Sequence, residues 1–111
     1  MFIIPEGFQE IWFNDLDVVE REKWGGTLKP SAVATLATPI PENKVDPKAW
    51  SISYLVAVGQ DLAMPEAFQK FLVEQARGAG AQVESVEMKS GHFVQISHMK
   101  EVAEWISVAS A

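Results

Sequence analysis

Apolar and polar residues follow different patterns on the two sides of a proline-rich stretch. Residues 39–47 contain three prolines, which forbid a continuous helix and interrupt sheet pairing. Beyond them, residues 52–58 form a nearly continuous apolar run that leads into a glycine, a pattern typical of a parallel strand buried on both faces. Residues 82–88 alternate and are more polar, which indicates a second strand near a sheet edge.

Two helices are predicted, one between these strands and one after them. The first has Pro65 in its first turn and ends at Gly78. Its apolar side chains recur at the spacing of one buried stripe, formed by Phe68, Phe71, Leu72 and Ala76. The last helix is amphipathic and begins near Ser97 or His98. This order of elements favours a right-handed crossover between parallel strands, and therefore an α/β fold class.

The part before the prolines is predicted to be helical. Asn14 can cap a helix that runs to Trp24, where two glycines follow and end it. Pro30 suits the first turn of a second helix over residues 31–38, whose small apolar side chains we expect to be covered on most sides or to line a pocket. The chain thus divides into residues 1–47, a helical segment with its linker, and residues 48–111, an α/β segment.

Composition narrows the possible partners and location. The chain has 111 residues, 48% of them hydrophobic, and a net charge of -6, so we expect neither nucleic acid nor an anionic membrane surface as a partner. The first five residues are too short for a signal peptide, and no apolar run is long enough to cross a membrane. The lack of cysteine excludes disulfides and thiolate sites and is compatible with a cytoplasmic location.

Two candidate catalytic residues follow the ends of the predicted strands. Asp61 comes just after the first strand, and His92 follows the second strand and a glycine. Catalytic groups of open α/β sheets gather at the carboxyl ends of the strands, where an acid can orient an imidazole that acts as a general base. An aspartate that caps the next turn and an ordinary loop histidine explain the same two positions, so both interpretations stay open at this point.

A nucleophile to complete such a site is missing. None of the serines stands in the Gly-x-Ser-x-Gly context of a nucleophile elbow, and no glycine-rich oxyanion loop is present near the N-terminus. The spacing of Asp61, His92 and His98 matches no metal motif, so we expect no metal, and no organic cofactor is implied.

Two longer stretches resemble a known family. Residues 50–69 (WSISYLVAVGQDLAMPEAFQ) and 90–106 (SGHFVQISHMKEVAEWI) resemble the C-terminal end of an α/β-hydrolase, in the branch that includes plant methyl esterases and hydroxynitrile lyases. In that branch a Tyr-Leu strand leads to the triad acid, a Pro-x-x-x-Gln helix follows, and Gly-His opens the stretch into the last helix. Residues 12–24 and 28–32 are similar to the latter part of the helical cap of that branch.

The resemblance implies roles for these residues. Asp61 would be the acid and His92 the base of a catalytic triad that acts on a small ester-like substrate. Residues 1–47 would be the end of the cap with its linker, and residues 48–111 the last two parallel strand–helix units. The pocket for the acyl or alcohol group would be lined by Trp12, Phe13, Leu36, Ala37 and Phe93.

The resemblance also implies what is missing and leaves alternatives. The nucleophile and oxyanion hole of the family lie in an N-terminal half that these residues do not contain, so we expect a C-terminal fragment without turnover of its own. A non-catalytic, receptor-like small-molecule binder is an alternative from another class, and lyase chemistry on the same triad is a third. Because the first strand has one encoded parallel partner, we expect self-association or pairing with a separate N-terminal piece.

Overall fold

A two-stranded parallel sheet organises the C-terminal part of the chain. The computed structural model describes residues 2–3, 7–42 and 46–111. Strand β3 (Ser51–Gly59) pairs with β4 (Gln82–Ser90) in parallel from end to end, and helix α4 (Glu66–Gly78) makes the crossover between them. Both predicted strands are confirmed and are longer than predicted. The chain therefore has mixed helices and strands around a parallel pair, as expected for the α/β class.

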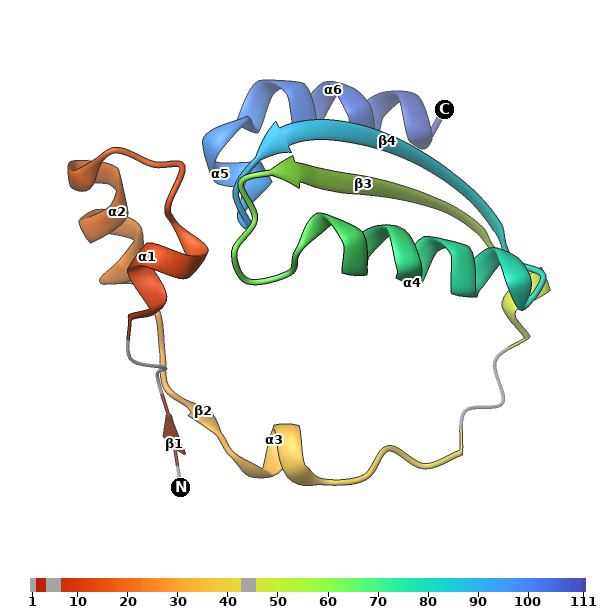
Figure 1. Ribbon diagram of the computed structural model, residues 1–111, viewed down its shortest axis with the longest axis horizontal. Helices are drawn as coiled ribbons and strands as arrows, with labels where there is room; N and C mark the ends of the chain where they lie inside the picture. The colour runs from red at the N-terminus through yellow and green to blue at the C-terminus, as the bar shows by residue number, and fades with distance from the viewer. Residues whose placement is uncertain (1, 4–6, 43–45) are drawn as a thin grey trace.

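Helices cover both faces of this sheet. Helix α4 lies on one face, and α5 (Val94–Ser97) and α6 (Met99–Ala109) lie on the other (Figure 1). Part of β3 is accordingly well buried, with Val56 2% and Ala57 4% exposed. Val73 of α4 and Val102 of α6 complete this small core. The expectation that β3 is buried on both faces is thus confirmed at its centre.

The N-terminal part consists of short elements. Helices α1 (Phe8–Trp12) and α2 (Val18–Gly25) lie beside the carboxyl ends of β3 and β4 (Figure 1). Strand β1 (Phe2–Ile3) pairs antiparallel with β2 (Ser31–Ala32). Helix α3 (Ala34–Ala37) and the 3-10 turn η1 (Pro47–Ala49) lie along the connection to β3. Part of the predicted proline-rich linker, residues 43–45, lies outside the described residues.

Two helix predictions for this part are wrong in their bounds. The helix expected from Asn14 begins instead at Val18, because the carboxylate of Asp17 accepts a hydrogen bond from the backbone N–H of Glu20 at 2.9 Å and caps it there. The helix expected over residues 31–38 is shortened to Ala34–Ala37, because Ser31 and Ala32 pair with β1 as a strand. Pairing between segments that are distant in the sequence overrides the local pattern.

The predicted buried stripe of α4 is also wrong. Phe68 is 48%, Phe71 53% and Leu72 36% exposed. The residues that α4 buries against β3 are Gln69 and Val73. The helix therefore carries an apolar stripe, with Phe68 and Phe71 stacked on each other at 6.3 Å between ring centroids, that the described residues leave largely uncovered.

The chain as a whole exposes an unusual amount of surface. Its accessible surface is 8113 Å², whereas a compact monomer of the same mass exposes about 6,100 Å². Its radius of gyration is 16.1 Å, compared with about 13 Å for a compact domain of this length. Much of the chain between β2 and η1 runs apart from α4 (Figure 1). In the described ranges, no helix is both long and apolar enough to cross a bilayer.

Candidate functional site

Asp61 and His92 meet at the carboxyl ends of the two parallel strands. The Nδ1 atom of His92 lies 3.2 Å from Oδ1 and 3.1 Å from Oδ2 of Asp61. A carboxylate is only an acceptor, so Nδ1 carries the proton of the neutral ring and Nε2 is left free to accept one. The Asp61 side chain is 3% exposed and the His92 side chain 30%. The ring is therefore held by a buried acid and still reachable from solvent.

The Asp61 carboxylate is itself fixed by its own loop. Its Oδ1 accepts hydrogen bonds from the backbone N–H groups of Ala63 at 2.9 Å and Met64 at 2.8 Å. These bonds explain its place in the sequence as a turn-capping aspartate, and the His92 contact exists in addition to them. The turn-capping interpretation of Asp61 is thus confirmed, and its contact with His92 leaves the catalytic interpretation open. The two backbone hydrogen bonds fix the Asp61 carboxylate in the position in which it contacts Nδ1 of His92.

Gln69 joins this acid to the strand before it. The Gln69 side chain is buried, and its Nε2 donates to Oδ2 of Asp61 at 3.2 Å and to the carbonyl of Met64 at 2.7 Å. The same amide exchanges two hydrogen bonds with the backbone of Ala57, at 2.9 and 3.0 Å. The buried stripe predicted for this helix did not include Gln69, so the apolar pattern missed it. The signal that pointed to it was the Pro-x-x-x-Gln spacing from Pro65.

Side chains of α4 also occupy part of the edge of β3. Gln69 bonds the backbone of Ala57, and the carboxylate of Glu66 accepts from the N–H of Gly59 at 3.2 Å. Backbone groups of alternate strand residues point to the same edge, so the edge away from β4 is closed at its carboxyl end by these side chains. Residues Ser51–Leu55 pair with β4 on one side only. On the opposite edge of β3 they have no strand partner in the part of the chain that the structure describes.

Three consecutive residues between α1 and α2 reach the same site. Phe13 is 2% exposed and stacks on Phe93 at 5.0 Å between centroids. Asn14 donates from Nδ2 to the carbonyl of Gln60 at 2.8 Å. Asp15 accepts at Oδ2 from the N–H of Gly91 at 2.7 Å. Sequence reasoning placed Asn14 at a helix cap and missed these contacts, because nothing local indicates partners 46 and 76 positions away.

The residues expected to line a substrate pocket do not all come together. Trp12 and Phe13 both pack on Phe93, and the Phe93 ring also meets the edge of the His92 ring at 5.1 Å. Leu36, which is 76% exposed, and Ala37 lie on α3, which Figure 1 shows away from the sheet. Three of the expected pocket residues thus form an aromatic cluster next to His92. The other two, Leu36 and Ala37, lie on α3 and are not part of this cluster.

No hydroxyl of the described residues is hydrogen-bonded to His92. All of the serines and threonines belong to those residues, and the nearest in sequence, Ser90, is fully buried and turned to the carbonyl of Met88. Ser97 pairs with His98 at 3.0 Å, but these are neighbours in the chain at the start of α6.

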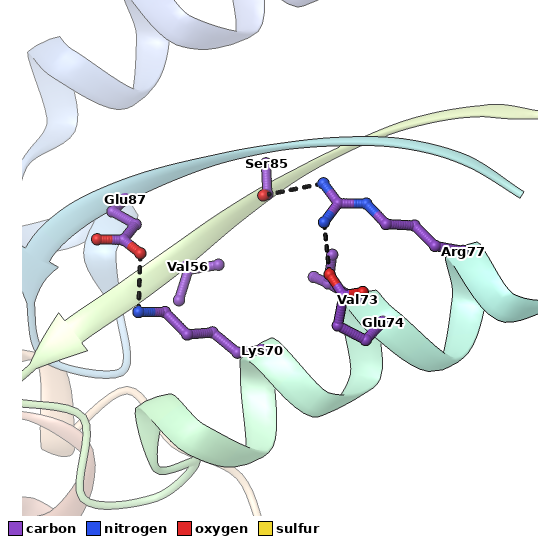
Figure 2. A pocket seen from close by; sticks show the side chains of 7 residues that line it. All are labelled: Val56, Lys70, Val73, Glu74, Arg77, Ser85 and Glu87. Carbon is purple, nitrogen blue, oxygen red and sulfur yellow. Dashed lines mark hydrogen bonds and ion pairs between the residues drawn. The ribbon is translucent and has the colours of Figure 1, made fainter.

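A shallow groove lies between α4 and the sheet (Figure 2). Lys70 spans it from Glu66 on its own helix at 2.6 Å to Glu87 on β4 at 2.8 Å. Hydrogen bonds to Glu66 and then to Glu87 raise the pKa of Lys70 to about 12, and the bond to Lys70 lowers the pKa of Glu66. Arg77 bonds Glu74 and Ser85 in the same groove. The Lys70–Glu87 pair and the Arg77–Ser85 bond cross from α4 to β4, so these side chains help to hold α4 on the sheet.

The described residues contain no candidate metal centre, and comparisons with known proteins found no relative. Across residues 2–3, 7–42 and 46–111, no group of three or more histidine, aspartate or glutamate side chains is arranged to hold a metal ion. No protein-family model, curated protein or solved structure matches the chain. A functional role can therefore be inferred only from the site residues themselves.

Proposed function

We propose that this chain supplies the acid–base pair of a serine-type α/β-hydrolase that acts on esters or related carbonyl compounds. The observation that carries the proposal is the hydrogen bond between Asp61 and Nδ1 of His92, formed across the carboxyl ends of two adjacent parallel strands. The family likeness of the surrounding residues supports it. The serine nucleophile and the oxyanion hole would come from chain outside these 111 residues.

The geometry supports separate chemical roles for His92 and Asp61. An incoming serine hydroxyl would donate its proton to Nε2 of His92 while its oxygen attacks the carbonyl carbon. Asp61 would keep the ring in the required tautomer and stabilise the imidazolium that forms. His92 would then pass the proton to the leaving alcohol, and in a second half-reaction it would activate water in the same way. No metal or organic cofactor takes part in this scheme.

The uncovered surface supports a partner that carries the rest of the enzyme. The chain exposes about 2,000 Å² more than a compact monomer of its mass, whereas a stable interface needs about 800 Å² from each partner. The open half of the β3 edge and the apolar stripe of α4 are the parts of this surface that a sheet-bearing partner would cover. In its absence we expect copies of the chain to associate through the same surface.

Ester hydrolysis by the native assembly tests the proposal. A purification tag fused in frame at the chromosomal locus retrieves the chain with whatever it is covalently or tightly joined to, and p-nitrophenyl acetate serves as substrate. We expect turnover that His92→Ala abolishes and that His98→Ala, a matched control at the other histidine, leaves unchanged. We expect the isolated 111-residue chain to show no turnover that depends on His92.

Two results would count against the proposal. Turnover by the native assembly that survives His92→Ala would remove His92 from the chemistry. Robust turnover by the isolated chain that is lost in His92→Ala would show that no outside nucleophile is needed.

A further inference from the structure

We infer that Phe13, Asn14 and Asp15, here called the clamp segment, position the Asp61–His92 pair by holding the two loops that carry it. The inference rests on the proposed function, because it assigns a positioning role within that catalytic site. The three residues touch neither Asp61 nor His92 through a hydrogen bond. They bind the residues next to each of them, in the loops that follow β3 and β4, which are far from the clamp segment in the sequence.

Each clamp residue has its own partner at the rim of the site. Asn14 holds the Asp61 loop through the carbonyl of Gln60, at 2.8 Å. Asp15 holds the His92 loop through the N–H of Gly91, at 2.7 Å. Since Gln60 directly precedes Asp61 and Gly91 directly precedes His92, one dipeptide spans the two loops. The distance between the Asp61 loop and the His92 loop decides whether the carboxylate and the imidazole are close enough to form a hydrogen bond.

Phe13 and Arg21 fix the clamp segment in turn. Phe13 is almost fully buried and stacks on Phe93, the residue after His92. Arg21 on α2 donates to the carbonyls of Asn14 and Leu16 at 3.4 and 3.3 Å. The segment is therefore anchored by α2 on one side and by the aromatic cluster on the other, as a support that positions a site needs to be.

The fit of Asp15 against Gly91 leaves no room for a Cβ atom unless the side chains of Asp15 and Asn14 shift. A Cβ atom on Gly91 would lie 2.5 Å from Oδ1 of Asp15 and 2.9 Å from Oδ1 of Asn14. Gly91 has no positive φ that would call for glycine on its own. Close approach of the clamp segment is therefore the reason that glycine is needed before His92.

The clamp segment also carries a cost in stability. Oδ1 of Asn14 and Oδ1 of Asp15 are buried and accept no hydrogen bond from the described residues. Burial of such oxygens is unfavourable, so packing alone would be served better by apolar side chains at these two positions. A positioning role, in which each side chain contributes one directed hydrogen bond, accounts for both polar residues.

The tautomer of His92 reports the positioning directly. In the isotope-labelled 111-residue chain, ¹⁵N chemical shifts of the neutral imidazole distinguish protonation at Nδ1 from protonation at Nε2. We expect the Nδ1-protonated form to dominate in the wild type and in Asp15→Asn, which retains an acceptor oxygen. In Asp15→Ala we expect loss of that preference, because the His92 loop is no longer held at its distance from Asp61.

Asp17→Ala is the matched control. It removes an aspartate two residues further along, whose carboxylate caps α2 and has no bond to the rim of the site. We expect it to lower stability and to leave the His92 tautomer unchanged. If Asp15→Ala does not fold by circular dichroism, Asn14→Ala, which loses only the exposed bond to Gln60, replaces it with the same expected loss.

The outcomes separate the clamp from the catalytic proposal. Retention of the Nδ1-protonated form in the folded Asp15→Ala or Asn14→Ala chain overturns the clamp and leaves the proposed function standing. An equal loss in Asp17→Ala also overturns it, because the effect would then be general destabilisation. Absence of the Nδ1-protonated form in the wild type contradicts the proposed function itself.

Discussion

Gly91 lies against Asp15, with its backbone N–H donating to the Asp15 carboxylate at 2.7 Å. The contact joins residues 76 positions apart and places the short connection between α1 and α2 over the loop that carries His92. This pair is one of the links between the N-terminal segment and the candidate catalytic pair, and it gives the first prediction.

Gly91→Ala should destabilise the chain by about 1–3 kcal/mol, the usual range for overpacking a tight contact. The added methyl group would lie too close to Asp15 for the hydrogen bond to survive. Urea unfolding followed by circular dichroism measures the change. Gly78→Ala is the matched control, because no atom lies within 4 Å of its Cβ position, and it should be neutral or stabilise α4 by about 0.5–1 kcal/mol. Equal effects of the two substitutions would contradict the close fit.

Asp61→Asn should lower kcat of the native assembly by about 10⁴-fold while the fold is retained. The amide oxygen of the substituted side chain can still accept from the N–H groups of Ala63 and Met64, and its NH₂ group then donates to Nδ1 of His92. That bond reverses the tautomer and puts the proton on Nε2, where the serine proton should go. Steady-state hydrolysis of p-nitrophenyl acetate measures the effect, with Asp46→Asn, which alters only the cap of η1, as control. A loss smaller than tenfold would argue against the assigned role.

Gln69→Leu should destabilise the chain by about 1–3 kcal/mol, because it leaves buried backbone groups unpaired. The groups affected are the N–H and carbonyl of Ala57, both bonded by the Gln69 amide. The same change removes one hydrogen bond from Asp61. Gln75→Leu, at an exposed position on the same helix, is the control and should change the unfolding free energy little. If Gln69→Leu were neutral in urea unfolding, the Gln69 amide would not be holding β3.

The isolated chain should self-associate, and Phe71→Lys should weaken the association. Phe71 is 53% exposed on the uncovered stripe of α4, and a charge there would remain buried in any contact that covers the stripe. Sedimentation velocity at several concentrations measures the effect. Val19→Lys, at a residue that is 73% exposed on α2, is the control for an added charge. A stable monomer at all concentrations would show that the surface needs no cover.

Local pattern was enough to predict the central elements. The apolar run at residues 52–58 and the alternation at 82–88 correctly indicated β3 and β4, and the positions of Asp61 and His92 after them indicated where the two side chains would meet. These features are readable because strand ends and parallel order follow from short segments and one crossover rule.

The supports of the site could not be read in the same way. The apolar residues around Gln69 suggested that they form the buried face of α4. The face that packs on the sheet is instead the one that carries Gln69, because its amide bonds the backbone N–H and carbonyl of Ala57. Asn14 and Asp15 looked like a helix start because their partners lie in the distant loops after β3 and β4. Ser31 and Ala32 looked helical because their pairing with β1 is invisible locally. In each case a contact between distant segments decided the outcome.

Identification of the reactive serine tests the central claim most directly. The native assembly, retrieved by its purification tag, is treated with a fluorophosphonate probe, which reacts covalently with an activated serine, and the labelled peptide is identified by mass spectrometry. The account predicts one labelled serine that lies outside these 111 residues, with labelling lost in His92→Ala and retained in His98→Ala. Labelling of a serine within these residues, or labelling that persists in His92→Ala, would contradict it.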